Sequence, residues 1–329
     1  MPGFIHSVIH PAVYHGHRKQ SPFFEGWYYK LVSADGTDRV AIIPAVILGE
    51  DGHAFIQILD GNQARMGYHP FSLTDFKAAK ERFEVQIAEN FFDLSGFSLN
   101  LDSNAGLASG TIQITDLTPW PVTLASPGVM GWYAWVPAME CYHGVLSFDH
   151  KLSGTLTLND RVVDFNGGRG YLEKDWGASF PEGYVWMQTN HFLQQGVSLM
   201  ASVAVIPWRR SAFPGFIIGL WQGGRLWRFA TYTGAKLETL EITEDYVLIG
   251  VQNRRRRLQL QADRVKGVAL RGPTKANMGL RVDESLAGTV AIRLSTLGGE
   301  VLFEGTGMHA GLEVVQPERL LHWIKGERK

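Results

Sequence analysis

The 329-residue chain has little cysteine, little excess charge and no long apolar run. Its single cysteine, Cys141, excludes an internal disulfide and a zinc site built from several thiolates, so a reducing compartment, the cytoplasm, is expected. The 31 basic and 32 acidic side chains create no broad positive field, and the one dense basic run is the four arginines at 254–257, so nucleic acid is not an expected partner.

The apolar stretches and the first residues argue against membrane insertion. The longest apolar stretches, 41–49 and 197–208, are too short to cross a bilayer, so no membrane span is expected. Residues 1–6 lack the basic stretch and apolar core of a signal peptide. Peripheral contact with a membrane stays open.

Alternation of apolar and polar residues with a period of two dominates the chain. Each alternating stretch predicts a strand with one buried face, and such stretches lie at 110–115, 151–158, 238–243, 258–262 and 290–295. The 37 glycines and turn pairs such as Asp51-Gly52 and Gly298-Gly299 predict antiparallel hairpins. Helices are expected at 75–88, rich in Lys, Ala and Glu, and at 317–325, which begins with Pro. The predicted class is all-β.

An aromatic motif that carries an acid occurs twice. The segment at 24–29 (FEGWYY) matches that at 180–186 (FPEGYVW), and an Ala-x-Ile-Pro segment follows each at nearly the same distance, at 41–44 and 204–207. Order and spacing predict two duplicated halves, 1–172 and 173–329. Closed antiparallel barrels remove exposed strand edges, and small ones can hold an apolar ligand. We therefore predict two tandem lipocalin-like β-barrels, with paired β-sandwiches as the alternative.

Several groups of reactive residues are interpreted as structural. The N-terminal histidines lack a carboxylate partner and HExxH spacing, so no metal site is predicted from His6, His10, His15 and His17. The glycines at 167–170 lack dinucleotide-binding spacing and predict a tight turn, and the arginine run predicts a surface hairpin. Glu140 would raise the pKa of the neighbouring Cys141, which favours a buried, unreactive thiol.

Carboxylates embedded among aromatic residues remain as candidate catalytic groups. Such surroundings raise the pKa of an acid by desolvation, and nearby rings stabilise cations through their faces. The combination suits protonation of an alkene in an apolar cavity, followed by capture of the carbocation by an internal nucleophile. The alternative interpretation is that the aromatics are core residues and that the acids are solvated or cap turns.

At these residues the chain resembles the tocopherol cyclase family. The resemblance rests on 24–30 (FEGWYYK), on 135–145 (WVPAMECYHGV) with LSG at 152–154, and on 170–177 (GYLEKDWG) continuing to 186–190 (WMQTN). It covers roughly residues 20 to 325 and implies a two-half lipocalin-like fold. It also implies an enzyme that closes the chromanol ring of a prenylated hydroquinone without a metal or redox cofactor. Asp175 stands where the plant-type motif has Asn, and Ala178-Ser179 replaces a glycine-rich stretch, so the substrate stays open.

The resulting hypothesis gives these residues roles. The candidate proton donors are Asp175 and Glu140, then Glu173 and Glu25, although Glu25 and Glu182, which the two motif copies share, fit a structural role better. The predicted substrate contacts are Trp27, Tyr28, Trp176 and Trp186 as cavity lining, and His143, Gln188 and Asn190 as partners of the polar head. No cofactor and no metal are expected, and the oligomeric state is open. The alternatives are a carrier of an isoprenoid or lipid without chemistry, and a related hydratase or pericyclase acting on an apolar polyene.

Overall fold

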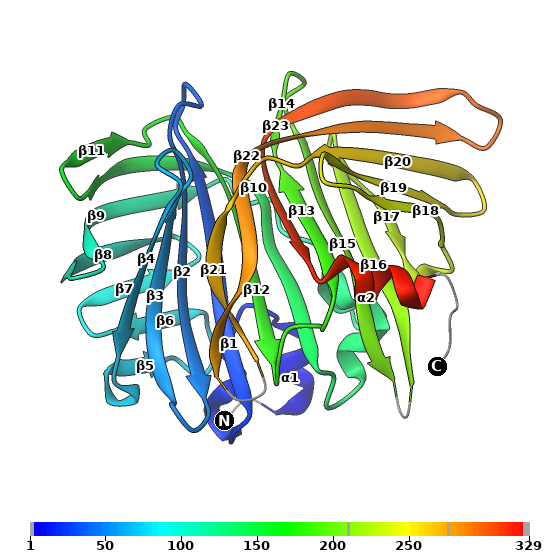
Figure 1. Cartoon of the computed structure of the whole chain (residues 1–329). Helices are drawn as coiled ribbons and strands as arrows, with labels where there is room; N and C mark the ends of the chain where they lie inside the picture. Colours follow the sequence, from blue (N-terminus) through cyan, green and yellow to red (C-terminus); the bar gives the residue numbers. More distant parts are fainter. Residues whose placement is uncertain (1–2, 209–210, 275–276, 325–329) are drawn as a thin grey trace. The chain divides into compact units, whose positions relative to one another are not determined.

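The chain forms two compact units in a computed structural model, which describes residues 3–208, 211–274 and 277–324 (Figure 1). The first unit comprises Met1–Phe180 with Arg271–Leu280, and the second comprises Pro181–Leu270 with Arg281–Lys329. Within the described residues, the α-helices are α1 (Phe4–Ile9) and α2 (Pro317–Ile324). Short 3-10 turns occur at η1 (Gly16–Arg18), η2 (Leu73–Asp75), η3 (Gly128–Trp135) and η4 (Thr231–Thr233). None of the described helices is long and apolar enough to cross a bilayer.

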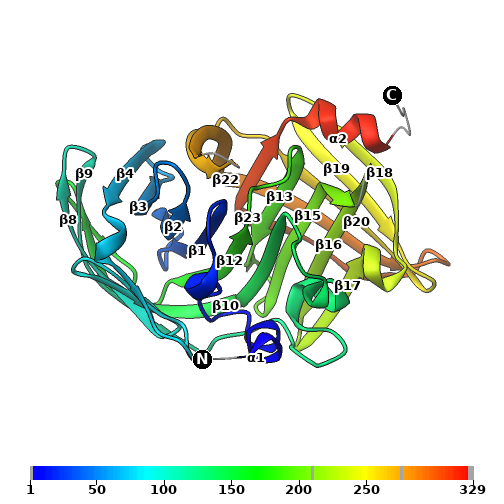
Figure 2. The same ribbon diagram turned by 90° about the horizontal axis from the view of Figure 1, so that it is seen from below.

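The first sheet is antiparallel and has twelve strands. They are β1 (Phe23–Val32), β2 (Arg39–Leu48), β3 (His53–Asp60), β4 (Arg65–Phe71), β5 (Phe76–Ala78), β6 (Glu84–Ile87), β7 (Asn90–Asp93), β8 (Gly96–Ser103), β9 (Gly106–Thr115), β10 (Cys141–Leu158), β11 (Arg161–Asp164) and β12 (Arg169–Gly177). Their order is β4-β3-β2-β1-β12-β10-β9-β8-β7-β6-β5, and β11 pairs with β10. The sheet curls around its core (Figure 2), so that Ser103 Oγ at the end of β8 lies 2.9 Å from His69 Nδ1 of β4.

The core of the first unit takes alternate residues of its strands. Trp27, Tyr29 and Leu31 of β1 all point into it, as the two-residue period of a strand requires. The Trp27 indole stacks on the ring of Phe83, with 5.1 Å between the ring centroids.

The helix predicted at 75–88 is wrong. This segment forms β5 and β6, joined by a turn. Its Lys, Ala and Glu content favours a helix, but Phe83, Val85 and Ile87 alternate and are buried in the core. Burial of that alternating row outweighs the weak intrinsic preference of the polar residues.

The second sheet repeats the strand order of the first. Its strands are β13 (Tyr184–Thr189), β14 (His191–Phe192), β15 (Val197–Trp208), β16 (Ser211–Gln222), β17 (Arg225–Ala230), β18 (Lys236–Ile242), β19 (Tyr246–Gln252), β20 (Arg256–Asp263), β21 (Val268–Pro273), β22 (Met278–Thr296) and β23 (Val301–Val315). The order β17-β16-β15-β13-β23-β22-β20-β19-β18 matches β4-β3-β2-β1-β12-β10-β9-β8-β7 position by position. The predicted all-β class, two tandem antiparallel barrels with a few short helices, is confirmed.

The two motif copies open equivalent strands, β1 and β13, but present opposite faces. In β1 the rings of Trp27 and Tyr29 enter the core, whereas in β13 the core takes Val185 and Met187. Successive residues of a strand face opposite sides, so a shift of one residue between the two copies exchanges their core and outer faces. Trp186, next to Val185 and Met187, therefore lies outside the second core. The sequence similarity therefore marks equivalent strands but not equivalent side chains.

The boundary predicted near residue 172 falls inside β12. This strand pairs with β1 on one side and with β10 on the other, both in the first sheet. Cutting there would break both ladders, and the compact units divide instead after Phe180.

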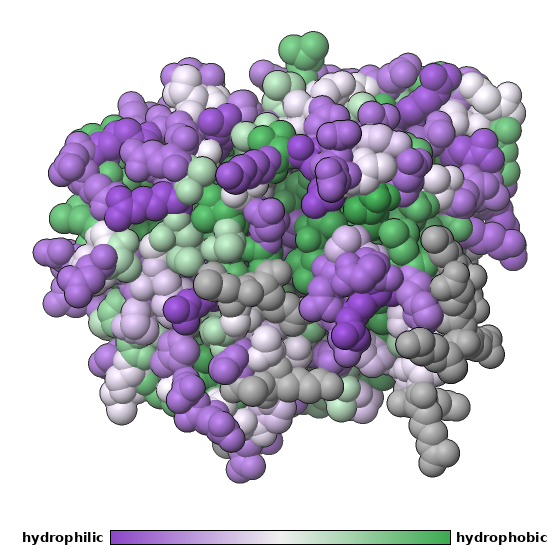
Figure 3. Space-filling model, viewed as in Figure 1, coloured by the Kyte–Doolittle hydropathy of each residue, from purple (hydrophilic) through white to green (hydrophobic). Residues whose placement is uncertain are grey.

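The C-terminal helix was predicted correctly, as α2, with residue 325 lying outside the described residues. Its apolar side is anchored in the second unit by Leu320, which is fully buried, and by the partly buried Trp323. Its outer side is hydrophilic (Figure 3). This amphipathic pattern explains why a helix forms on a β framework.

Candidate active site

β12 carries titratable side chains on both faces. Alternate residues of a strand point to opposite sides, so Tyr171, Glu173 and Asp175 share one face and Lys174 lies on the other with Trp176. Trp176 belongs to the core of the first unit. The row of Tyr171, Glu173 and Asp175 therefore lies on the face opposite that core. Tyr171 and Glu173 are nevertheless buried.

His143 of β10 joins this row. It stands directly opposite Asp175 in the β10–β12 ladder, and its Nδ1 lies 2.8 Å from Asp175 Oδ1. Its Nε2 lies 3.4 Å from Glu173 Oε2, and the Tyr171 hydroxyl donates a hydrogen bond to that same carboxylate oxygen. We call His143, Tyr171, Glu173 and Asp175 the acid cluster.

The acid cluster holds a proton on its imidazole. Burial alone would lower the pKa of His143, but the carboxylates of Asp175 and Glu173 outweigh burial and raise the pKa to about 9. His143 is therefore an imidazolium at neutral pH, with one N–H bonded to Asp175 and the other directed at Glu173. Burial and the adjacent Glu173 also raise the pKa of the Tyr171 hydroxyl, which keeps it protonated and donating.

Asp175 is the member of the cluster that is more open to a ligand. Its side chain is 24% exposed, against 6% for Glu173. Cys141 Sγ lies 3.9 Å from Asp175 Oδ1, and burial, Asp175 and Glu140 all raise the pKa of the thiol. This geometry agrees with the interpretation of Cys141 as unreactive.

The opposite face of β12 carries a buried ion pair. Lys174 Nζ lies 2.6 Å from Glu25 Oε1, and both side chains are fully buried. Lys174 also donates to the carbonyls of Pro11 and Val13, the first at 3.1 Å. Burial lowers the pKa of Lys174 to about 8, against the attraction of Glu25. We call Glu25, Lys174 and His15 the N-terminal clamp.

His15 completes the clamp as a neutral imidazole. Its backbone N–H donates to both carboxylate oxygens of Glu25, at 3.1 and 2.9 Å. Its Nδ1 accepts from Lys174 at 2.9 Å, and its Nε2 lies 3.1 Å from the carbonyl of Ser7, so the proton sits on Nε2. Burial and Lys174 both lower the pKa of His15. With every polar atom of Glu25 engaged on the core face, its position favours a structural role over proton donation.

The structure brings only part of the predicted site together. Tyr28 stands opposite Glu173 in the β1–β12 ladder and shares the face of the acid cluster. Trp27 and Trp176 lie in the core on the other face, and their predicted role as cavity lining has no support from that position. Glu140 directly precedes β10, where its carbonyl accepts from the backbone N–H of Ala178 at 2.8 Å.

Three predicted contacts belong to the second unit. Trp186 and Gln188 lie on β13 and Asn190 follows it, all three buried. Their binding to a substrate stays a prediction. Tyr171 and Lys174 were not singled out from the sequence. The two-residue spacing of Tyr171, Glu173 and Asp175 within one strand is the signal that identifies Tyr171.

The acid cluster also contains the donor atoms of a possible ligand set. His143, Glu173 and Asp175 offer one ligand atom each, and these atoms lie within 4.8 Å of one another. A metal ion binds a neutral imidazole. Here the imidazole is protonated and bonded to Asp175, so a metal would have to displace that proton. The contacts describe a hydrogen-bonded acid and base group better than a coordination site.

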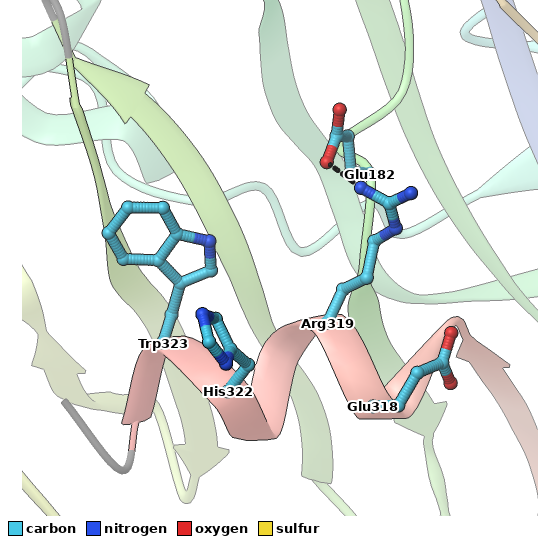
Figure 4. A pocket seen from close by; sticks show the side chains of 5 residues that line it. All are labelled: Glu182, Glu318, Arg319, His322 and Trp323. Carbon is cyan, nitrogen blue, oxygen red and sulfur yellow. Dashed lines mark hydrogen bonds and ion pairs between the residues drawn. The ribbon is translucent and has the colours of Figure 1, made fainter. Parts of the chain in front are cut away.

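A separate pocket lies on the second unit beside α2. It has a volume of about 380 Å³ and is lined by Glu182, Glu318, Arg319, His322 and Trp323 (Figure 4). Arg319 reaches toward Glu182, with Nη1 2.7 Å from Oε2, and both side chains are more than half exposed. Glu182 thus forms a surface ion pair, which fits its predicted structural role. The pocket brings together no buried acid of the kind found on β12.

Comparison with known proteins assigns the family. The family model described as tocopherol cyclase-like matches residues 21–315. The chain belongs to the tocopherol cyclase-like family. The resemblance inferred from the motifs is thereby confirmed.

Plant relatives match this family member over part of their length. A probable chloroplastic tocopherol cyclase of Oryza sativa subsp. japonica is 26% identical over 160 residues, which cover 46% of this chain and 33% of that protein. The chloroplastic tocopherol cyclase of Zea mays is 24% identical over 197 residues, covering 56% and 41%. The chain therefore spans less than half the length of these curated relatives.

Crystal structures support the fold. A structure of CghA with Sch210972 aligns with a TM-score of 0.55 at 13% identity and covers 89% of both chains. Kievitone hydratase from Nectria haematococca aligns with a TM-score of 0.50 at 12% identity, covering 92% of this chain and 93% of its own. At these identities the likeness establishes the shared architecture alone.

Proposed function

We propose that this chain is an acid-initiated cyclase that forms an oxygen-containing ring on a prenylated hydroquinone or a similar isoprenoid. Membership of the tocopherol cyclase-like family supports the reaction class. The observation that carries the proposal is the acid cluster, in which a protonated His143 bonds to the more open carboxylate, Asp175. A proton source of this kind is what an alkene needs to become a cation.

The proposed reaction begins at Asp175. The carboxyl group transfers a proton to the less substituted carbon of a trisubstituted alkene and leaves a tertiary cation. The phenolic hydroxyl of the same substrate adds to that cation and returns its proton to the cluster. One C–H and one C–O bond form while an alkene π bond and an O–H bond break, so the product is an isomer of the substrate.

His143 supplies the proton that Asp175 must carry. Moving it from Nδ1 to the carboxylate is uphill in the free protein, because the pKa of His143 is about 9. An apolar substrate over Asp175 would exclude water and destabilise the carboxylate charge, which makes the transfer easier. Glu173 and Tyr171 hold the imidazole in place from its other side. Positioned proton transfer of this type contributes about 100- to 10,000-fold to a rate.

Ring closure rather than hydration depends on keeping water from the cation. Within the substrate, the hydroxyl is already beside the cation, so its addition has the advantage of an intramolecular reaction. The Tyr28 ring lies on the same face of the sheet as the cluster, and we expect it to stabilise positive charge by about 0.5 to 2 kcal/mol.

The test is incubation of the purified chain with a phytyl or geranylgeranyl hydroquinone, followed by chromatography and mass spectrometry. We expect a product with the mass of the substrate and a different retention time, with and without EDTA. A product heavier by one water would instead identify a hydratase. Quantitative recovery of the starting lipid, bound but unchanged, would identify a carrier and contradict the proposal.

A further inference from the structure

The first unit has an exposed apolar surface outside the acid cluster. Phe4 and Ile5 of α1 are 60% and 61% exposed, and Leu124 and Trp132, which precede β10, are 68% and 45% exposed. Val122 adds a smaller apolar surface, at 39% exposure. We call these five residues the apolar patch. Isolated exposed apolar residues are ordinary, but a group of large ones on neighbouring segments marks an interaction surface.

Contacts join the two segments of the apolar patch. α1 packs on η3 (Figure 2), and the ring centroids of Phe4 and Trp135 lie 6.1 Å apart. The Trp135 indole N–H donates to the carbonyl of Leu124 at 3.0 Å, and Trp132 stacks on Tyr133. The apolar side chains therefore project from one connected structure.

Both segments lack acidic residues. Residues 1–24 contain no aspartate or glutamate, and residues 117–139 contain no charged residue of either sign. Further along the chain from α1, the basic side chains of Arg18 and Lys19 are exposed. Segments that carry exposed apolar and aromatic side chains and no acids, one of them followed by Arg18 and Lys19, match the interface of an anionic bilayer. The surface of such a bilayer attracts Lys and Arg, and its headgroup region accommodates aromatic rings.

The same segments adjoin the strands that carry the acid cluster. The carbonyls of Pro11 and Val13, just after α1, accept hydrogen bonds from Lys174 of β12. The η3 segment leads through Glu140 into β10, which carries His143. The apolar patch thus lies on the two segments that adjoin the strands of the cluster.

We propose that the apolar patch docks this protein on an anionic lipid bilayer. Phe4, Ile5, Leu124 and Trp132 enter the headgroup region, and the basic residues after α1 contact lipid phosphates. Taken with the proposed function, on which this part rests, docking would let an isoprenoid substrate pass from the bilayer to the protein without crossing water. The docking itself does not depend on catalysis.

Vesicle co-sedimentation of the full chain tests the docking. We expect the protein to bind vesicles of phosphatidylcholine with phosphatidylglycerol, and to bind vesicles of phosphatidylcholine alone more weakly. The variants F4S/I5S and L124S/W132S should each weaken binding at least tenfold. The matched control V162S/L193S removes two apolar side chains that are 70% and 105% exposed at other places, and it should bind as the parent protein does.

Two results would overturn the docking. One is absence of vesicle binding by the parent protein, or equal binding by the patch variants and the control. The other is concentration-dependent dimerisation, measured by light scattering and lost in the patch variants, which would assign the patch to a second copy. Turnover of a detergent-dispersed substrate distinguishes this proposal from the proposed function. The patch variants should retain that turnover, because the substrate then does not come from a bilayer. Vesicle binding by a protein that shows no turnover would support the docking and contradict the proposed cyclase activity.

Discussion

His143 owes its positive charge to two neighbouring carboxylates. Its ring is largely withdrawn from water, which by itself disfavours the imidazolium, yet Asp175 and Glu173 raise its pKa from 6.5 to about 9. The same two contacts fix the ring on both of its nitrogen sides. His143 thereby carries a proton within the cluster and contacts both of its carboxylates.

The raised pKa of His143 predicts a stability that falls with pH. A group whose pKa is higher in the folded state stabilises fully below its unfolded pKa, and that contribution is lost as the pH rises to the folded value. Between pH 6.5 and 9 the loss amounts to about 3 kcal/mol. Urea unfolding at several pH values should show this loss in the parent protein and a much smaller one in H143Q.

Comparison of the parent protein with H143Q also separates the pH dependence due to His143 from that due to Lys174. The pKa of Lys174 is lowered from 10.5 to about 8, so its contribution rises with pH between those values and opposes that of His143. Lys174 is present in both proteins, and the difference between them reports on the imidazole. Parallel stability curves for parent and H143Q between pH 6.5 and 8 would contradict the assignment.

Among the acids, Asp175 is predicted to be indispensable. D175N keeps the shape of the side chain and cannot carry the transferred proton, so kcat for the isoprenoid substrate should fall at least 100-fold with the fold retained. E182Q is the matched control, because Glu182 lies in an exposed ion pair on the second unit, and it should be unchanged. E140Q tests the other ranked donor. Full activity of D175N, with loss in E140Q, would transfer the role to Glu140.

At the scale of elements, the two faces of β12 carry different groups of side chains. One face presents the acid cluster, while the other presents Lys174, which holds β1 through Glu25 and the N-terminal segment through backbone carbonyls. Because alternate residues diverge, a strand can place an acidic side chain and a buried cation one residue apart on opposite faces.

Breaking the buried ion pair should cost stability but not the chemistry of the opposite face. K174M leaves the Glu25 carboxylate buried without its cation, and we expect a loss of about 3 to 5 kcal/mol in urea unfolding. The double variant E25L/K174M removes both charges and should lose less. Turnover of the folded fraction should stay within a few-fold of the parent. A K174M protein of parental stability would show that the pair contributes nothing.

The sequence could predict the strands and most hairpins, because alternation and turn residues are local signals. It could not predict which face a motif residue uses. Glu25 and Trp27 look the same in a sequence whether they meet the core or a ligand, and only the register of β1 against β12 decides. His143 and Asp175 were named together from the family motif, yet they are 32 positions apart in the chain and meet only through the ladder between β10 and β12. The helix predicted at 75–88 was wrong for a related reason, because the core residues that this hairpin packs against lie far away in the sequence.

At the scale of the whole molecule, the chain repeats one strand order and varies the side chains on it. β1 and β13 occupy the same position in their sheets, but the first adjoins β12 with its acid cluster and the second adjoins β23. Equivalent backbone positions thus carry different chemistry. We infer that a repeated barrel supplied two frameworks and that substitution on the first produced the acid cluster.

The most direct measurement of acid-initiated cyclisation is the reaction run in D2O. If Asp175 protonates the alkene, the donated hydrogen comes from a group that exchanges with solvent. After back-exchange of the hydroxyl, the product should carry a single carbon-bound deuterium beside the new ring oxygen-bearing carbon, located by mass spectrometry and NMR. Product formation without carbon-bound deuterium, or at an undiminished rate in D175N, would contradict protonation by this cluster.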